Sequence, residues 1–417
     1  MRTVSISLVR LLIASVILLV PHASTAQVLG VQGDHFTVSG NPQFLVFISY
    51  SDGLRRIPDV SNCNDSLNTN TLKTDLQYLA TKKVAGIRVF PNWQDPSSTL
   101  MDVTGALRCL QLKKLKALVG LAAQNGLVVD LSFTIDTVKD TSTNPPTPMS
   151  ATAYKTGMQS VATELLGKKN VLFDLQNELD HGGNRAPGYT VAQWQAYLAT
   201  QIKPAVRAND PSRLLTVSWT SNYPTQDVFN NIQDNTYDLL ADHYGHGSTG
   251  GWENDTQLRA TEFRNDFIGR GPRRPIYLQE PNRFRSTTET SGFDNNESNY
   301  VTAVRQAFIS GAAAWTFHNP ESGNLSGTTP FACTDNEAVP RGNCLLRHDE
   351  QLLLEDLYRS NAHVLNDATI SWGATSPKEF ARSDFDVNSC LIARNFTTDP
   401  IARLVGVGHY VAITVPF

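Results

Sequence analysis

Short apolar stretches recur along most of the chain, and amphipathic stretches with helical spacing separate them. Eight apolar stretches have the length and composition of buried strands, at residues 44–50, 84–90, 127–133, 171–177, 214–219, 237–244, 275–280 and 312–317. Helices are predicted at residues 72–83, 110–126, 158–169, 191–210, 297–311 and 347–365. Alternating strands and helices indicate a parallel sheet, and eight such units predict an α/β fold of the (β/α)8 TIM barrel type. An open doubly wound sheet is the alternative, although no predicted strand runs into a GxGxxG turn.

Two parts of the pattern fall outside this alternation. In residues 35–46, apolar and polar positions alternate around Ser39-Gly40-Asn41-Pro42, which predicts a β-hairpin leading into the first barrel strand. Beyond the last predicted helix, strands of a small C-terminal antiparallel β appendage are predicted at residues 369–373, 389–396 and 404–415. The chain therefore divides into a barrel at residues 27–366 and a small β extension at residues 367–417 that packs on it.

The amino terminus has the features of an export signal. Arg2 and Arg10 precede the apolar run LLIASVILLV, Pro21 ends that run, and small residues lead to an expected cut after Ala26. An uncleaved anchor is the alternative, but the run is short for a membrane span of about 20 residues. Residues 1–26 are thus predicted to be a signal peptide, and the mature chain to be secreted, either extracellular or periplasmic.

Composition and charge narrow the class of partner. The chain has 417 residues, 41% of them hydrophobic, which is ordinary for a globular protein. Its formal net charge is -4 and its pI is near 6.1, so it has no global basic field for nucleic acid or an anionic membrane. We expect a neutral ligand, no membrane association after signal cleavage, and a monomer.

The cysteines favour disulfides over a metal site. An exported chain with five cysteines can form at most two bridges. The natural pairs are Cys63 with Cys109 and Cys333 with Cys344, and Cys390 remains over. No CxxC spacing occurs among them, and the histidines show no HExxH spacing, so no metal or other cofactor is expected.

The candidate chemistry lies where predicted strands end. In a barrel of this type the carboxyl ends of the strands converge on one rim, where active sites form. Asn177 and Glu178 end the fourth predicted strand, and Glu280 ends the seventh. Two carboxyl groups about 5 to 5.5 Å apart are what double-displacement glycoside cleavage requires, one as nucleophile and one as acid and then base.

These motifs resemble the clan of retaining glycoside hydrolases that includes the family 5 cellulases and mannanases, over about residues 35 to 365. The Asn-Glu pair after strand four, the Glu that ends strand seven, GIRVFPNW on strand two, the hairpin and AWTFHN on strand eight carry the resemblance. The resemblance implies Glu178 as acid/base, Glu280 as nucleophile and Asn177 as a partner of the sugar 2-hydroxyl. It also implies that Arg88 steadies the nucleophile and that Trp315 is an aromatic platform for the sugar.

Strand six departs from the clan. The clan often has His-x-Tyr there with both side chains inward, whereas this chain reads DHYGHG. Either His243 or Tyr244 fits the inward pattern, and we expect both to line the site. Because indoles cover the apolar faces of sugars, Trp93 and Trp219, which follow or end strands, are further candidates for substrate binding.

The resemblance therefore implies a secreted retaining glycosidase that cleaves a β-linked polysaccharide or oligosaccharide through a glycosyl-enzyme, without a cofactor. A transglycosylase would have the same two glutamates, and a non-catalytic glycan-binding barrel is the alternative from another class. The sequence leaves open which glycan is cleaved, and whether cleavage is endo or exo.

Overall fold

The structure of the chain is a computed structural model. It describes residues 27–51, 53–92, 98–220, 237–244, 251–267, 274–284, 293–294, 296–318, 353–354, 379–382 and 391–394, with the backbone alone for 265–267, 283–284, 293, 379–382 and 391–394. The predicted signal at residues 1–26 lies outside these ranges, as do residues 404–415 and most of the predicted helix at 347–365. The signal, the cleavage point and the domain boundaries stay predictions.

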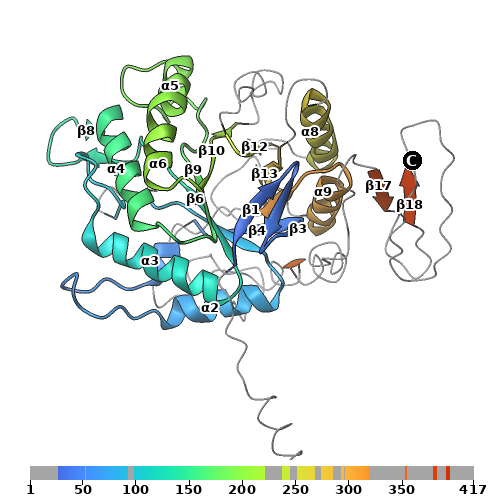
Figure 1. Cartoon of the computed structure of the whole chain (residues 1–417), viewed down its shortest axis with the longest axis horizontal. Coiled ribbons are helices and arrows are strands. Elements are labelled where there is room, and N and C mark those ends of the chain that lie inside the picture. The colour runs from blue at the N-terminus through green and yellow to red at the C-terminus, as the bar shows by residue number, and fades with distance from the viewer. Residues whose placement is uncertain are drawn as a thin grey trace, which may run out of the picture.

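One parallel sheet forms the centre of the molecule (Figure 1). In the described chain its order is β10-β9-β6-β5-β4-β16-β13-β12-β11. Its strands are β4 (Leu45–Ser49), β5 (Gly86–Val89), β6 (Val128–Ser132), β9 (Val171–Asp174), β10 (Leu214–Thr216), β11 (Ser218–Trp219), β12 (Leu240–His243), β13 (Ile276–Glu280) and β16 (Ala314–Phe317). β10 and β11 belong to one stretch interrupted at Val217, and they pair with β9 and β12, so this stretch closes the sheet. The eight predicted strands and the (β/α)8 barrel are confirmed.

The predicted hairpin covers the end of the barrel where the strands begin. β2 (His35–Val38) pairs antiparallel with β3 (Asn41–Gln43), and β1 (Leu29–Gln32), which the pattern did not predict, pairs with β2. Buried side chains of this small sheet form one apolar cluster with inward side chains of the barrel; its members include Leu29, Phe36, Val38, Leu45, Phe47, Val128, Leu172 and Tyr277. The interior at this end is therefore packed, and only the opposite rim is left for chemistry.

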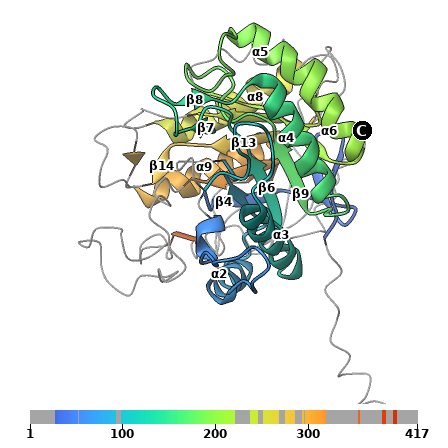
Figure 2. The ribbon, with the colours of Figure 1, turned by 90° about the vertical axis from the view of Figure 1, so that its left-hand side faces the viewer.

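Helices surround the barrel. They are η1 (Gly53–Arg56), α2 (Asn70–Thr81), α3 (Cys109–Gln124), α4 (Ala151–Glu164), α5 (Val191–Tyr197), α6 (Lys203–Asn209), α8 (Trp252–Phe267) and α9 (Glu297–Ile309). Figure 2 shows α3, α4 and α6 on the outside of β6 and β9. The larger apolar cluster lies between strands and helices and includes Val129, Phe173 and Leu215, which alternate with inward positions. α8 is a helix that the hydrophobic pattern did not reveal, because its sequence is largely polar.

The helix predicted at residues 191–210 is present but not uniform. Thr190 and Gln193 form a capping box at the start of α5. A π-helical turn, η2 (Leu198–Ile202), then separates α5 from α6. Pro204 is the second residue of α6, and in a regular helix its ring would clash with the carbonyl group of Thr200, four residues earlier, so the turn widens locally before the helix resumes.

A disulfide joins Cys63, in the segment after β4, to Cys109, the first residue of α3. This pairing was predicted and is confirmed. Cys333, Cys344 and Cys390 lie outside the described residues.

The C-terminal part contains a two-stranded antiparallel sheet. β18 (Leu391–Arg394) lies within the predicted strand at residues 389–396, and it pairs with β17 (Glu379–Arg382), which the pattern did not predict. The antiparallel appendage is thus confirmed, whereas the strand predicted at 369–373 lies outside the described ranges. Two short pairs lie in the loops, β7 (Lys139–Asp140) with β8 (Thr147–Pro148) and β14 (Arg283–Phe284) with β15 (Phe293–Asp294).

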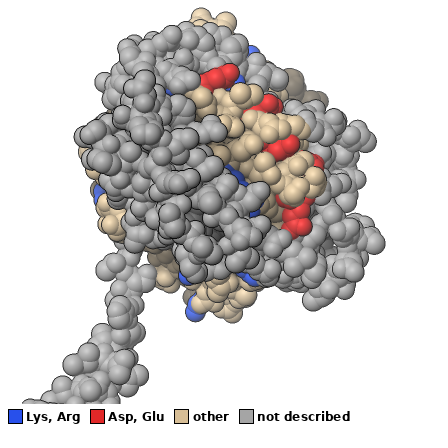
Figure 3. Space-filling model, turned by 90° about the vertical axis from the view of Figure 1, so that its right-hand side faces the viewer, with Lys and Arg blue, Asp and Glu red and all other residues tan. Residues whose placement is uncertain are grey.

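Acidic side chains are spread over the side of the molecule formed by α8 and α9 (Figure 3). Glu253 and Asp255 lie in the first turn of α8, and Glu297 lies in the first turn of α9. Carboxylates at these positions interact favourably with the helix dipole. Among the helices that the structure describes, none combines the length and apolar character needed to cross a bilayer.

Candidate active site

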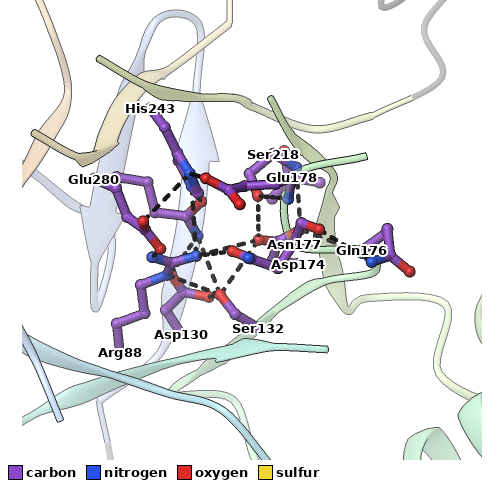
Figure 4. A network of polar contacts seen from close by, with 12 residues as sticks. Arg88, Asp130, Ser132, Asp174, Gln176, Asn177, Glu178, Ser218, His243 and Glu280 are labelled. Carbon is purple, nitrogen blue, oxygen red and sulfur yellow. Dashed lines mark hydrogen bonds and ion pairs between the residues drawn. The ribbon is translucent and has the colours of Figure 1, made fainter. Parts of the chain in front are cut away.

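Strand alternation decides which strand-end residues face the barrel interior. On β9, Val171 and Phe173 pack outward against helices, while Leu172 and Asp174 point inward. The same alternation on β12 turns His243 inward. Figure 4 shows the inward side chains from several strands meeting at one place.

Glu178 and Glu280 lie on either side of this meeting point. One carboxylate oxygen from each, together with a ring nitrogen of His243, lies within 4.8 Å of the other two. Nδ1 of His243 is 3.2 Å from Oε1 of Glu178 and 3.5 Å from Oε2 of Glu280. Two strand ends that are far apart in the sequence therefore place their carboxylates at the distance that one glycosidic bond can bridge.

Glu178 sits in a strained turn. β9 ends at Asp174, and the chain bends so that Glu178 has φ 47°, the left-handed region that residues with a side chain rarely adopt. Its backbone N–H donates to Oγ of Ser218 at 3.0 Å, which holds the turn against the neighbouring strand. The side chain of Glu178 is 19% exposed and that of Glu280 is 7% exposed, so Glu178 is the more accessible carboxylate.

Arg88 on β5 organises the floor of the site. Its guanidinium donates from Nη1 to Oε1 of Glu280, from Nη2 to Oδ1 of Asn177 at 2.6 Å, and from Nε to Oγ of Ser132 at 2.8 Å. The side chain of Arg88 is completely buried. The positive charge therefore stabilises the ionised form of Glu280 in a place where water cannot do so.

Two further carboxylates lie beneath the glutamates. Asp130 and Asp174 are completely buried, and their Oδ2 atoms are 3.5 Å from Nε and 3.7 Å from Nη2 of Arg88. Burial raises the pKa of Asp130 to about 6, although Arg88 opposes the shift. Burial also raises the pKa of Asp174 against the opposing effects of Arg88 and Ser218. The interior thus holds more carboxyl groups than cationic groups. Burial without enough positive charge favours the protonated forms of Asp130 and Asp174.

His243 bridges the two glutamates. Burial alone lowers the pKa of His243, but the charge of Glu280 and the hydrogen bond with Glu178 outweigh burial, so its pKa is raised. Its other ring nitrogen, Nε2, lies 3.1 Å from Oε1 of Gln279. The two glutamates therefore favour a proton shared between this ring and its carboxylate neighbours.

His318 is an inward residue at the end of β16, next to Glu280. Its Nε2 lies 3.7 Å from Oε2 of Glu280, and its Nδ1 lies 2.8 Å from Oγ of Ser49 at the end of β4. The site therefore contains two histidines beside the same carboxylate.

Three aromatic residues do not lie where the sequence suggested. Trp219, Tyr244 and Trp315 occupy outward positions of their strands and belong to the apolar cluster between strands and helices. Tyr244 accepts hydrogen bonds from Trp315 at 3.0 Å and from Thr256 of α8 at 2.7 Å. All three are at most 1% exposed, so the expectation that they contact a sugar is corrected. The physical reason is alternation, because a strand-end residue reaches the interior only on every second position.

The same alternation shows how DHYGHG on the sixth strand corresponds to the His-x-Tyr motif of the clan. His243 points inward, whereas Asp242 points outward and pairs with Arg259 of α8 at 2.8 Å. His243 therefore takes the histidine position of the His-x-Tyr motif, and the tyrosine position falls on Gly245, outside the described residues. Trp93, the remaining aromatic candidate, also lies outside them.

Several polar residues of the site were not recognised in the sequence, namely Ser49, Asp130, Ser132 and Gln279. For two of these residues the sequence contains a pattern from which an inward position could have been predicted. Asp130 and Ser132 alternate with apolar residues in the strand VVDLS, so a polar inward face could have been predicted there. Ser49 and Gln279 stand at strand ends without any comparable pattern.

The site has a donor set that could accommodate a cation. Within the described ranges, Glu178, His243 and Glu280 are the group of side chains whose oxygen and nitrogen atoms have the spacing of metal ligands. These atoms also contact one another directly, and the positive charge of Arg88 lies against Glu280. Two glutamates with such contacts can cleave an acetal by proton transfer and nucleophilic attack alone.

The barrel, the paired glutamates at its carboxyl-end rim and the arginine beneath them define a glycosidase, an enzyme that hydrolyses O-glycosyl compounds. The chain belongs to glycosyl hydrolase family 5, because the sequence profile of its cellulase domain matches residues 54–271. A search of curated protein sequences finds no match.

Solved structures of family 5 enzymes share the fold. A mannosidase from Rhizomucor miehei has 13% sequence identity and a TM-score of 0.56, with 82% of this chain and 98% of that chain covered. A mutant of that mannosidase in complex with mannosyl-fructose has 12% identity and a TM-score of 0.54, covering 81% and 99%. A β-1,4-D-mannanase from Cryptopygus antarcticus has 15% identity and a TM-score of 0.53, covering 82% and 96%.

Proposed function

We propose that this glycosidase cleaves a β-linked polysaccharide or oligosaccharide with retention of anomeric configuration. Glu280 attacks the anomeric carbon, and Glu178 first protonates the leaving oxygen and then deprotonates the incoming water. The observation that carries the proposal is the short separation of the two carboxylates, within 4.8 Å, which leaves no room for a water molecule between sugar and nucleophile.

The surroundings of the two glutamates support this division of roles. A nucleophile must be ionised, and the ion pair with Arg88 stabilises the charge of Glu280. An acid/base must exchange protons with the leaving group and then with water, and Glu178 is the more exposed of the two. The side-chain oxygen of Asn177 accepts a hydrogen bond from Arg88, which leaves its amide nitrogen as a donor for a sugar hydroxyl.

The choice of a β-linked glycan follows from family membership and from the named neighbours. A mannanase and a mannosidase share the fold at low identity, so β-mannan and short β-mannosides are the first substrates to test, with β-glucans beside them. The disulfide Cys63–Cys109 favours an oxidising compartment and so supports export. Secretion and the monomeric state stay predictions.

The test is to follow product configuration by NMR. The purified enzyme is incubated with β-mannan, β-glucan and aryl β-glycosides, and the anomeric proton of the first product is recorded before mutarotation. Retention of the β configuration is expected. Initial release of the α anomer would overturn the proposal, because inversion needs carboxylates about 6.5 to 9.5 Å apart.

Azide rescue assigns the two roles separately. In Glu178→Ala, azide should react with the glycosyl-enzyme and give a β-glycosyl azide. In Glu280→Ala, azide should replace the nucleophile and give an α-glycosyl azide. The opposite products would exchange the roles, and full activity of either variant without azide would remove that residue from catalysis. Added acceptor sugar in the wild-type reaction distinguishes hydrolysis from transglycosylation.

A further inference from the structure

Gln279 connects a buried carboxylate to the histidine of the site. It lies on β13 beside Glu280, is completely buried, and points inward. Its Nε2 donates to Oδ2 of Asp130 at 2.6 Å, and its Oε1 lies 3.1 Å from Nε2 of His243. His243 contacts Glu178 at 3.2 Å (Figure 4). This contact completes a chain of four side chains from β6 to the acid/base.

The orientation of the Gln279 amide follows from its partners. An ionised carboxylate only accepts hydrogen bonds, so the amide NH2 must face Asp130. Oγ of Ser132 lies 3.4 Å from the same nitrogen and is a second oxygen on that side. Because burial raises the pKa of Asp130 only to about 6, Asp130 is ionised at neutral pH and holds this orientation.

The orientation of Gln279 in turn selects the tautomer of His243. The amide oxygen of Gln279 only accepts, so Nε2 of His243 must carry a hydrogen. In the neutral ring Nδ1 then has a lone pair, and Nδ1 is the atom that faces Glu178. A hydroxyl hydrogen on Oε1 of Glu178 satisfies that lone pair.

We propose that Gln279, oriented by Asp130, is a positioning residue that keeps Nε2 of His243 protonated and so reserves Nδ1 for the proton shared with the acid/base Glu178. The inference rests on the proposed roles of the two glutamates. The Glu178–His243 pair holds one proton between Oε1 and Nδ1, ready for the leaving group. When Glu178 gives this proton to the glycosidic oxygen it becomes the carboxylate that later deprotonates water.

Other charged groups face His243 and act on it directly. They are Arg88 on β5, Asp174 on β9 and Glu280 on β13. Nη2 of Arg88 lies 3.5 Å from Nε2 of His243, so a lone pair on Nε2 would find a donor there. The hydrogen bond to Gln279 is shorter, and it keeps the hydrogen on Nε2.

The direct test is the tautomer of His243. The protein is labelled with 15N-histidine, the ring signals of His243 are assigned by their loss in a His243→Asn variant, and the ring nitrogens are measured at pH 7. The wild type should show hydrogen on Nε2, and Gln279→Met should shift the ring toward hydrogen on Nδ1. An unchanged tautomer in Gln279→Met would overturn the inference.

A conservative variant provides the rescue. In Gln279→Glu a protonated glutamic acid can donate its hydroxyl to Asp130 while its carbonyl oxygen accepts from Nε2 of His243, as the amide does. Asp130 is ionised at neutral pH, and its negative charge favours the protonated form of the introduced buried carboxyl group. At pH 7 this variant should therefore keep the wild-type tautomer, and it remains informative if Gln279→Met does not fold. Hydrogen on Nδ1 at pH 7 in Gln279→Glu would count against the inference.

Kinetics distinguish loss of the positioning role of Gln279 from a general loss of folded structure. Phenyl and 2,4-dinitrophenyl β-mannobiosides and β-cellobiosides differ in how much acid assistance their leaving groups need. Gln279→Met should lower kcat/KM for the phenyl glycoside by about tenfold to a hundredfold. For the dinitrophenyl glycoside kcat/KM should change by less than about threefold, because that leaving group departs without a proton.

A matched substitution controls for effects on folding. Gln111 is also a buried glutamine, but it lies on α3, so Gln111→Met makes the same chemical change away from the site. It should change neither the tautomer nor the ratio of the two aryl substrates. An equal loss on both substrates in Gln279→Met would show structural damage and contradict positioning. If the wild type cleaves neither glycoside, the proposed function fails, whereas the tautomer measurement needs no substrate and still decides the inference.

Discussion

Arg88 on β5 forms an ion pair with Glu280 on β13, and β4 and β16 lie between these two strands in the sheet. The pair therefore spans the barrel interior instead of joining neighbours. A completely buried arginine needs compensating negative charge, and Glu280, the proposed nucleophile, provides part of it. The proposed catalysis and the stability of the fold are consequently linked through the side chain of Arg88.

Replacement of Arg88 by methionine should affect both the stability of the fold and the rate of catalysis. It leaves the buried carboxylates without their cation, so the free energy of unfolding should fall by about 3–5 kcal/mol. The kcat of the folded variant should fall by about a hundredfold or more, because Glu280 loses its main electrostatic partner. Chemical denaturation and steady-state kinetics measure the two effects.

Arg56→Met is the matched control for Arg88→Met. Arg56 is also completely buried and donates from Nε to Oδ2 of Asp75 at 2.6 Å, outside the site. The Arg56→Met variant should lose a similar amount of its free energy of unfolding, while the folded variant keeps the kcat of the wild type. Equal kcat values for the two variants would contradict the role assigned to Arg88.

The stability of the protein should depend on pH through Asp130. Its pKa is about 6 in the folded chain against an ordinary value of 3.8, so the folded state binds a proton more tightly than the unfolded state. The contribution of this group to the free energy of unfolding is therefore fully present below about pH 4 and declines as pH rises through 6. The decline amounts to about 3 kcal/mol.

Asp130→Asn isolates this effect because asparagine does not titrate. The free energy of unfolding of the variant minus that of the wild type should increase by about 3 kcal/mol between pH 4 and pH 7. Urea denaturation at both pH values, with m-values compared, gives the difference. A difference independent of pH would mean that Asp130 titrates normally.

The contact between Ser49 and His318 should affect the proposed nucleophile, Glu280. The 2.8 Å hydrogen bond to Nδ1 orients the ring toward Glu280. Ser49→Ala should lower the free energy of unfolding by about 1 kcal/mol. It should lower kcat/KM by about fivefold, because the ring loses its fixed orientation. Ser49→Thr keeps the hydroxyl and should stay close to wild type, and an equal loss in both variants would argue against the hydrogen bond.

The disulfide Cys63–Cys109 should stabilise the fold. It closes a loop with a sequence separation of 46, and the loss of conformational entropy in the unfolded chain should be worth about 2–4 kcal/mol. A Cys63→Ala, Cys109→Ala double variant should therefore melt at a lower temperature than the wild type under oxidising conditions. Reductant should lower the Tm of the wild type toward that of the variant, and an equal Tm without reductant would show that the bridge contributes nothing.

Some parts of the fold and site followed from local sequence. Short apolar strands and amphipathic helices are visible as periodicity, because each element must bury one face or both. The rule that barrel sites form where strands end selected Glu178 and Glu280 from many acidic residues. The structure brings both together with Asn177, Arg88 and His243.

The aromatic predictions show where local reasoning ended. Trp219, Tyr244 and Trp315 stand at strand ends like the glutamates, yet their side chains point outward. Strand-end position does not fix the side a residue faces, and an irregularity changes the count. In β13 the pairing with β12 moves from Leu278 to Glu280 and skips Gln279, so Gln279 and Glu280 both reach the site. The π-helical turn before α6 is a similar local event that periodicity does not show.

The sequence by itself determined the eight barrel strands, most of the helices between them and the glutamates that end two of those strands, and it favoured the pairing of Cys63 with Cys109. Only the tertiary structure decided which strand-end side chains meet, because closure of the barrel joins residues from strands that are distant in the chain. The tertiary structure also shifts the pKa values of titratable side chains in the site. The raised pKa values of Asp130 and His243 come from burial and from charges on other strands, which no local pattern contains.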